Sequence, residues 1–354
     1  MKNGFIVSAR YDTLFFTGSL LVPLGLWAAF SIGWMTGVAV YATFQLAFNL
    51  PHNFQTWTLS LLDEGDRAKN GRRYVIALAA CILIFAVPMV LSPDGVYPWV
   101  RDALIYWGYY HLVRQHYGFQ RLYERKLQNV TPLESKLYGR YLDAVSYLPL
   151  LIRFRDPELM TIHAGGMSVW VKHPVLPPSV WMPIAALYGA CIAAAIAHHV
   201  WMASRGRTGL LPRALHLGTV TIGFGLAVLV IRDLVVAIAV VTAFHNLQYI
   251  GLVWFHNRTR AELGETAGNP SVGWVRNGQL AYYAGASILY GLLIFAPRAL
   301  FRHERLAELP ITVVVALHYY VDARVWRFSD RPQLGRYLKL TRPAPPPKAV
   351  ASTG

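Results

Sequence analysis

Histidine side chains occur inside several long apolar runs of this 354-residue chain. An ionisable side chain within a membrane-spanning segment is costly and rare, so it suggests a functional site. Four runs that lie far apart in the sequence carry one each: His52, His111, His245 and His318. Counted from the basic end of each run, at about 1.5 Å per helical residue, all four lie roughly 13–16 Å deep. The pattern therefore predicts four imidazoles at a similar level of one helical bundle.

A carboxylate accompanies the last of these histidines. His318 and Asp322 are four residues apart, so they point to the same face of a helix. A histidine and a carboxylate at this spacing can chelate one metal ion, or the carboxylate can orient the imidazole. The candidate catalytic residues, which are also candidate metal ligands, are His52, His111, His245, His318 and Asp322. His116 and His256, which lie closer to the basic side, are further candidate metal ligands.

A simpler interpretation exists for each histidine taken alone. Polar side chains often form hydrogen bonds between membrane helices, and a single buried histidine fits that role. Four histidines at a common depth, one of them with a carboxylate on its own helix face, favour a metal or proton-transfer site instead. Trp326, like other aromatic residues at the ends of runs, is expected in the interfacial belt.

The donor types narrow the choice of metal. The two cysteines, Cys81 and Cys191, lie in apolar runs away from the histidines, so an iron–sulfur cluster is not expected. Imidazole and carboxylate donors suit non-haem iron, which is favoured, and also zinc or copper. A site buried in the bilayer would receive a lipophilic small molecule sideways from the membrane. The pattern indicates an oxygenase or a related oxidoreductase.

Three segments resemble the bacterial membrane β-carotene 15,15'-dioxygenases, the bacteriorhodopsin-related-protein family. They are Leu50-Pro51-His52, the stretch 245–254 that begins with His245 and ends with Val253-Trp254, and His318-Tyr319-Tyr320-Val321-Asp322. The resemblance implies a helical bundle in which non-haem iron and O2 cleave a carotenoid double bond. It also implies that His52, His111 and His245 are iron ligands, with His318 near them. This chain departs from the family at Tyr249, where the family has a second histidine, and in spacing His318 and Asp322 one residue closer.

The composition indicates the elements that must position these residues. Hydrophobic residues make up 55% of the chain and charged residues 14%, against roughly 25% charged in soluble domains. Ten runs are predicted to span the membrane: 12–31, 35–62, 73–92, 98–119, 137–152, 179–203, 213–231, 233–256, 275–296 and 308–327. The second is overlong, and we expect Pro51 to kink it. The fold class is therefore an all-α polytopic integral membrane helical bundle of about 8–10 transmembrane helices.

The positive charge predicts the orientation. The formal net charge is +15, and most Lys and Arg residues lie in short loops between apolar runs, so nucleic-acid binding is not expected. This distribution predicts a multi-pass protein of the bacterial inner membrane, in contact with membrane lipids, with both termini in the cytoplasm. The basic loop 298–305 is an exception, because it would lie outside. Residues 153–178 are expected to form a polar external loop. Residues 1–340 are expected to form one transmembrane domain and 341–354 a disordered Pro-rich tail.

Several functions remain open from the sequence. The leading hypothesis is a non-haem iron oxygenase acting on a carotenoid, an isoprenoid or a fatty acyl chain. The alternatives are a proton-coupled transporter that uses the buried His and Asp residues as a relay, and a haem-binding membrane protein. A metal-free transferase with histidine as general base is a further possibility.

Overall fold

The computed structural model describes residues 4–127, 130–164, 167–301 and 304–340, and it is built from long helices. Each of the ten predicted spans overlaps one long helical segment, although the span 275–296 begins in the short helix α11 (Pro270–Arg276). Six of these segments contain a single helix: α5 (Glu64–Leu91), α6 (Tyr97–Leu127), α7 (Pro132–Arg153), α8 (Pro178–Ser204), α10 (Leu234–Glu262) and α12 (Leu280–Leu300). The other four are α1 (Ala9–Asp12) with η1 (Thr13–Thr17), η2 (Gly18–Leu20) and α2 (Leu21–Ser31); α3 (Gly37–Phe44) with η3 (Gln45–Asn49) and α4 (Leu50–Leu59); α9 (Leu211–Gly225) with η5 (Leu226–Val230); and η6 (Arg305–Glu308) with α13 (Leu309–Val325).

Seven of the described helical segments are long and apolar enough to cross a membrane: 9–31, 64–91, 178–204, 211–230, 234–262, 280–300 and 305–325. Among them, α5, α8 and α12 turn large apolar side chains outward, such as Leu83, Leu187 and Leu293. The segment 37–59 and helices α6 and α7 are also long, but they carry more polar residues. The expected all-α polytopic bundle is confirmed, and its polar side chains are concentrated on inner helices.

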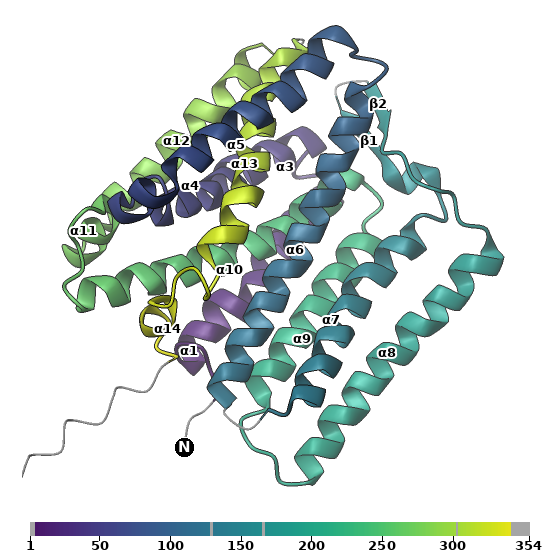
Figure 1. The fold of residues 1–354 in the computed structure, drawn as a ribbon. Coiled ribbons are helices and arrows are strands. Elements are labelled where there is room, and N and C mark those ends of the chain that lie inside the picture. The colour runs from purple at the N-terminus through teal and green to yellow at the C-terminus, as the bar shows by residue number, and fades with distance from the viewer. Residues whose placement is uncertain (1–3, 128–129, 165–166, 302–303, 341–354) are drawn as a thin grey trace, which may run out of the picture.

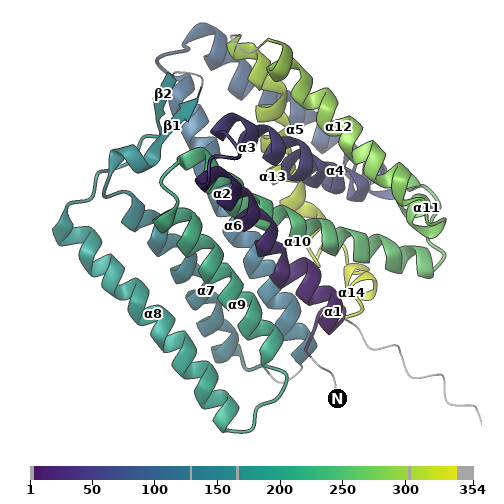
Figure 2. The same ribbon diagram turned by 180° about the vertical axis from the view of Figure 1, so that it is seen from behind.

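Helix α10 occupies the middle of the molecule. In Figures 1 and 2, α6, α7, α8 and α9 form one group of helices, and α4, α5, α12 and α13 form another, with α10 running between them. Most of α10 is buried, including Phe244, Tyr249 and Val253. Residues on α10 can therefore contact both groups, which makes it the natural place for a shared site.

The helix type changes just before Pro51, the residue at which we predicted a kink. The π-helical segment η3 ends at Asn49, and α4 begins at Leu50 with Pro51 in its first turn. Proline has no backbone N–H. It is tolerated in the first turn of a helix because the N–H groups there have no carbonyl partner within that helix. Single π-helical turns inside helices are frequent at functional sites. Here the irregular turn comes directly before His52.

Most of the basic loops meet at one end of the bundle. Arg260 at the end of α10 pairs with Asp63 before α5 at 2.7 Å, and Arg331 pairs with Asp66. Lys126 at the end of α6 donates to the carbonyl of Lys339 at 3.0 Å. These contacts join the ends of α4, α6 and α10 to the segment that contains α14 (Leu334–Tyr337). We call this the α1–α14 end, because α1 also lies there (Figure 1).

The exceptional basic loop belongs to the opposite end. Arg305 pairs with Asp94 at 3.1 Å, and Arg298 pairs with Glu308 at 2.7 Å. The acidic partners neutralise much of this loop, which explains how it departs from the charge pattern of the other loops.

The segment 153–178 is more ordered than a plain loop. It contains η4 (Pro157–Met160) and an antiparallel hairpin of β1 (Thr161–Ala164) and β2 (Met167–Trp170). Ile162 pairs with Val169, and Thr161 pairs with Trp170. The β-branched and aromatic residues that favour this hairpin are few and are interrupted, so the polar-loop prediction missed it. The predicted tail 341–354 lies outside the described residues.

Candidate metal centre

Four helices deliver five of the predicted site residues to one place. His52 comes from α4, His111 from α6, His245 from α10, and both His318 and Asp322 from α13. His52, His111 and His245 form one group whose potential ligand atoms all lie within 4.8 Å of one another. His111, His318 and Asp322 form a second such group. All five side chains are buried.

The shortest distances within the cluster match two ligands of a single ion. His52 Nε2 and His318 Nε2 are 2.9 Å apart. Two ligands at about 2.1 Å from a metal and at right angles to each other are about 3.0 Å apart. His111 Nε2 lies 3.9 Å from Asp322 Oδ2. Two ligands of one metal ion reach this separation when the angle between their bonds to the metal is wider than a right angle. The pair His52 and His318 and the pair His111 and Asp322 are therefore each spaced as two ligands of one ion would be.

Unpartnered ring nitrogens also fit a bound ion. His111 Nε2 and His245 Nδ1 are buried and have no hydrogen-bond partner among the described residues. Nearly all buried polar atoms in proteins have a partner, and an exception calls for an unseen water or ion. The chemistry of these residues therefore fits a metal ion. They are buried imidazole and carboxylate donors, and two of the ring nitrogens have no hydrogen-bond partner among the described residues.

A chain of hydrogen bonds connects Asp322 to His318 and sets its tautomer. The Tyr249 hydroxyl donates to Asp322 Oδ1 at 2.5 Å. Since that hydroxyl has one hydrogen, Thr56 Oγ1 must donate to Tyr249 across their 2.8 Å contact. Thr56 Oγ1 then accepts from His318 Nδ1 at 2.9 Å. His318 Nε2 is left with a lone pair that faces the cluster, as a metal ligand requires.

Trp326 completes the surroundings of the carboxylate. Its Nε1 lies 3.1 Å from Asp322 Oδ1 and 3.2 Å from the Tyr249 hydroxyl, and it donates to both. Trp326, which we expected in the interfacial belt, turns its indole N–H inward to the site. The signal was present in the sequence, since Trp326 is four residues after Asp322 and so shares its helix face.

An aromatic stack holds His111 against α13. The Tyr319 ring stacks on His111 with centroids 4.6 Å apart and planes at 28°. The Tyr319 hydroxyl lies above Gly108 of α6, where an added Cβ would come within 2.7 Å of its oxygen. Gly108 therefore lets Tyr319 approach α6 closely enough to cover the imidazole.

His116 and His256 lie outside both groups of potential ligands. The His116 ring stacks on Phe244, and its centroid is 6.1 Å from that of His245. His256 Nδ1 contacts Asn257 Oδ1 at 3.0 Å, at the α1–α14 end. Among the described residues, the structure does not bring these two histidines to the other five.

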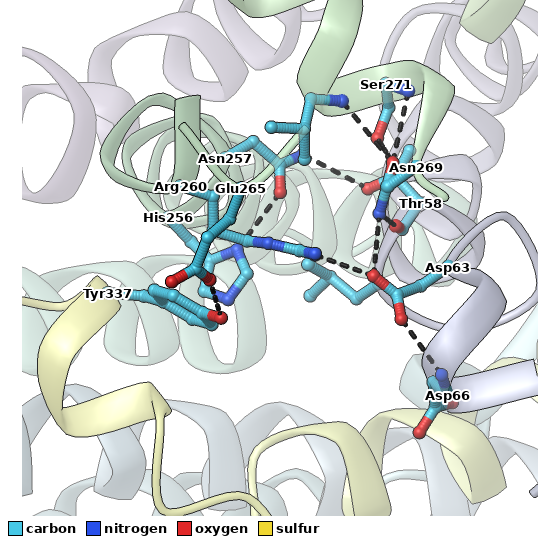
Figure 3. A network of polar contacts seen from close by, with 12 residues as sticks. Thr58, Asp63, Asp66, His256, Asn257, Arg260, Glu265, Asn269, Ser271 and Tyr337 are labelled. Atoms are coloured by element: carbon cyan, nitrogen blue, oxygen red, sulfur yellow. Dashed lines mark hydrogen bonds and ion pairs between the residues drawn. The ribbon is translucent and has the colours of Figure 1, made fainter. Parts of the chain in front are cut away.

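His256 instead belongs to a polar network at the ends of α4 and α10 (Figure 3). In this network Arg260 donates to Asp63, and Asn269 donates to both Asp63 and the carbonyl of Thr58. Burial acts to raise the pKa of Asp63, but the hydrogen bonds from Arg260 and Asn269 outweigh it and hold that pKa below its ordinary value. The contacts are those of a structural joint between α4, α10 and α11 (Pro270–Arg276).

The fold and the cluster together define a polytopic α-helical membrane protein with buried His and Asp side chains that could hold a metal ion. No family model, no curated protein and no solved structure matches the chain. The resemblance to carotene dioxygenases therefore stays an expectation drawn from three short segments.

Proposed function

We propose that this protein is a membrane-embedded, metal-dependent oxygenase or related oxidoreductase that acts on a lipophilic substrate. The observation that carries the proposal is the meeting of four imidazoles and one carboxylate, from four helices, inside an apolar bundle. Charged and ionisable groups are expensive in such a place, and a shared metal ion is the simplest compensation for bringing five together.

The donor set favours non-haem iron over the other candidate metals. Histidine and carboxylate ligands that leave coordination positions of the metal open are usual for iron that activates dioxygen. Zinc and copper also bind these donors, but this donor set does not specifically favour them. When bound, the iron would supply the oxygen chemistry. The chain's own residues would hold it through His52, His111, His245, His318 and Asp322.

The hydrogen-bonded residues around the cluster act on its ligands. Thr56 and Tyr249 keep the His318 lone pair directed inward, and Trp326 holds the carboxylate. Such partners around a metal site normally strengthen its affinity. A carotenoid, an isoprenoid or a fatty acyl chain would reach the site from the bilayer, where it is already dissolved. We propose the inner membrane of a bacterium as its location, with both termini cytoplasmic.

The spacing argues against a haem between these histidines. Two axial nitrogens on opposite faces of a porphyrin are about 4 Å apart. His52 Nε2 and His318 Nε2 are 2.9 Å apart, which leaves no room for a macrocycle between them.

Metal analysis on detergent-purified protein, never exposed to chelator, tests the proposal. We expect about one or two iron ions per chain, lost in His52→Ala and in His318→Ala. His163→Ala on the surface hairpin is the matched control and should keep the metal, since that side chain is 46% exposed. Purified wild-type protein that contains no metal and takes up no Fe(II), Zn(II) or Cu(II) would overturn the proposal. A transporter using the same residues would instead show proton-coupled uptake in vesicles.

A further inference from the structure

A second row of buried polar side chains leads away from the candidate centre. It begins at His116 of α6, whose ring centroid is 6.1 Å from that of His245. It continues to His216 of α9 at 5.9 Å and then to Tyr123 of α6 at 5.5 Å. Since Tyr123 lies about two turns beyond His116 on the same helix, the row runs toward the α1–α14 end.

Most polar atoms of this row lack a well-formed hydrogen bond to any described residue. These atoms are His116 Nδ1 and Nε2, His216 Nδ1 and the Tyr123 hydroxyl, all of them buried. His216 Nε2 contacts the carbonyl of His116 at 3.1 Å. Gln248, one turn from His245 on α10, faces His116, and its Oε1 also lacks such a bond, while its Nε2 donates to the carbonyl of Phe16. So many unbonded polar atoms along one line require an explanation.

Two polar side chains approach the row, Gln248 at His116 and Asp12 at Tyr123, but neither makes a well-formed hydrogen bond to it. The described rings that touch the row include Phe224 and Phe244 against His116, and Phe119 against His216. Aromatic carbon cannot satisfy a ring nitrogen or a hydroxyl in the way an oxygen or nitrogen atom does. Water is the partner that fits, because an internal water molecule makes about three hydrogen bonds to such groups.

The spacing of the row suits single bridging waters. Two hydrogen bonds of about 2.8 Å through one water span up to roughly 5.6 Å. The successive ring centroids are 5.5–6.1 Å apart, so the rings touch, and a bridging water lies beside them at their polar edges.

The outer end of the row lies beneath the N-terminal segment. Tyr123 lies beside the carboxylate of Asp12, which is itself buried. Asp12 accepts hydrogen bonds from the backbone of Ile6 at 2.7 Å and of Val7 at 3.0 Å. The next residue, Ser8, is exposed. The row thus ends one short segment below the surface.

We propose that His116, His216 and Tyr123 bind a file of internal water molecules that connects the candidate metal centre with the surface at the α1–α14 end. Water, and protons carried along it, exchange with the buried cluster by this route without crossing the lipid phase. The hydration of the row does not depend on the proposed metal. Only its role in serving a metal site rests on the proposed function.

Brief hydroxyl-radical labelling by water radiolysis, read by peptide mass spectrometry, tests the file, because the radicals form from water held next to a side chain. In the intact protein we expect His116, His216 and Tyr123 to be oxidised within about ten-fold of the exposed His163, despite their burial. Phe85, buried in an apolar cluster of α5, is the dry reference and should stay unlabelled. Absence of label on both His116 and His216 would overturn the proposal.

Variants test the continuity of the row. His216→Phe should lower labelling of His116 at least about five-fold while Tyr123 stays labelled, because the file is interrupted between them. His199→Phe on α8, a histidine outside the row, is the matched control and should change neither. Should His216→Phe fail to fold, Tyr123→Phe keeps the ring and should lower labelling of His216. Unchanged labelling of His116 in His216→Phe, or of His216 in Tyr123→Phe where only that variant folds, contradicts the route. Measured without metal, the same labelling separates the two proposals, since a protein that binds no metal can still show the water file.

Discussion

The Tyr249 hydroxyl donates a hydrogen bond to Asp322 Oδ1 at 2.5 Å, and this bond determines the direction of the hydrogen bonds that reach His318. Tyr249 is connected to the cluster through Thr56 and Asp322. It acts on the candidate ligands from both sides, as the acceptor for Thr56 and the donor to Asp322.

Tyr249→Phe should weaken metal binding about 10- to 100-fold, because Thr56 would lose its acceptor and Asp322 a donor. The measurement is competition for Fe(II) or Zn(II) against a calibrated chelator. Tyr290→Phe is the matched control, since its buried hydroxyl bonds to Trp57 at 2.8 Å away from the cluster. Equal affinities for the two variants would show that Tyr249 has no role in positioning the ligands.

Gly108→Ala should destabilise the protein by about 1–3 kcal/mol, because the new methyl group would collide with the Tyr319 hydroxyl. Tyr319 would have to leave its stack on His111, so metal content should fall as well. Gly118→Ala lies on the same helix with no atom within 4 Å of the new Cβ, and it should be neutral or slightly stabilising. Thermal unfolding in detergent, with metal analysis of each variant, provides the comparison. A Gly108→Ala protein as stable and as metal-rich as Gly118→Ala would contradict the close approach.

Metal should raise the thermal stability of the wild-type protein. At a free metal concentration of 100 times the dissociation constant, the folded state gains about 2.7 kcal/mol. Adding Fe(II) to chelator-treated protein should therefore raise its unfolding temperature, and His318→Ala should not respond. A shift of equal size in His318→Ala would show that the metal that stabilises the protein binds at another site.

The contact of Asp63 with Arg260 predicts an acid-sensitive joint at the α1–α14 end. The pKa of Asp63 is held below its ordinary value in the folded protein, so its ionised form stabilises the fold at neutral pH. That contribution is fully present above the ordinary pKa of about 3.9 and is lost as the pH falls through the lower folded value. Asp63→Asn should therefore be less stable at pH 7 and should lose less stability on acidification, as measured by thermal unfolding across pH. Asp94→Asn, at an exposed ion pair, should change little.

The sequence by itself determined the class of fold and the level of the site along the helices. Apolar length predicts a span, and a fixed rise per residue converts sequence position into depth, so His52, His111, His245 and His318 could be placed at a common level. His318 and Asp322 could be placed on one face for the same reason, since helical periodicity is a local property.

Only the tertiary structure decided which residues actually meet. Depth says nothing of how each helix is rotated about its axis or which helices are neighbours, because both depend on packing between segments far apart in the chain. Depth therefore could not decide whether His116 and His256, which lie closer to the basic side, join the other five, or whether the Trp326 indole N–H turns toward the site. The contact between Tyr249 of α10 and Asp322 of α13 joins residues that are 73 positions apart in the chain. No local sequence pattern predicts a contact over that separation.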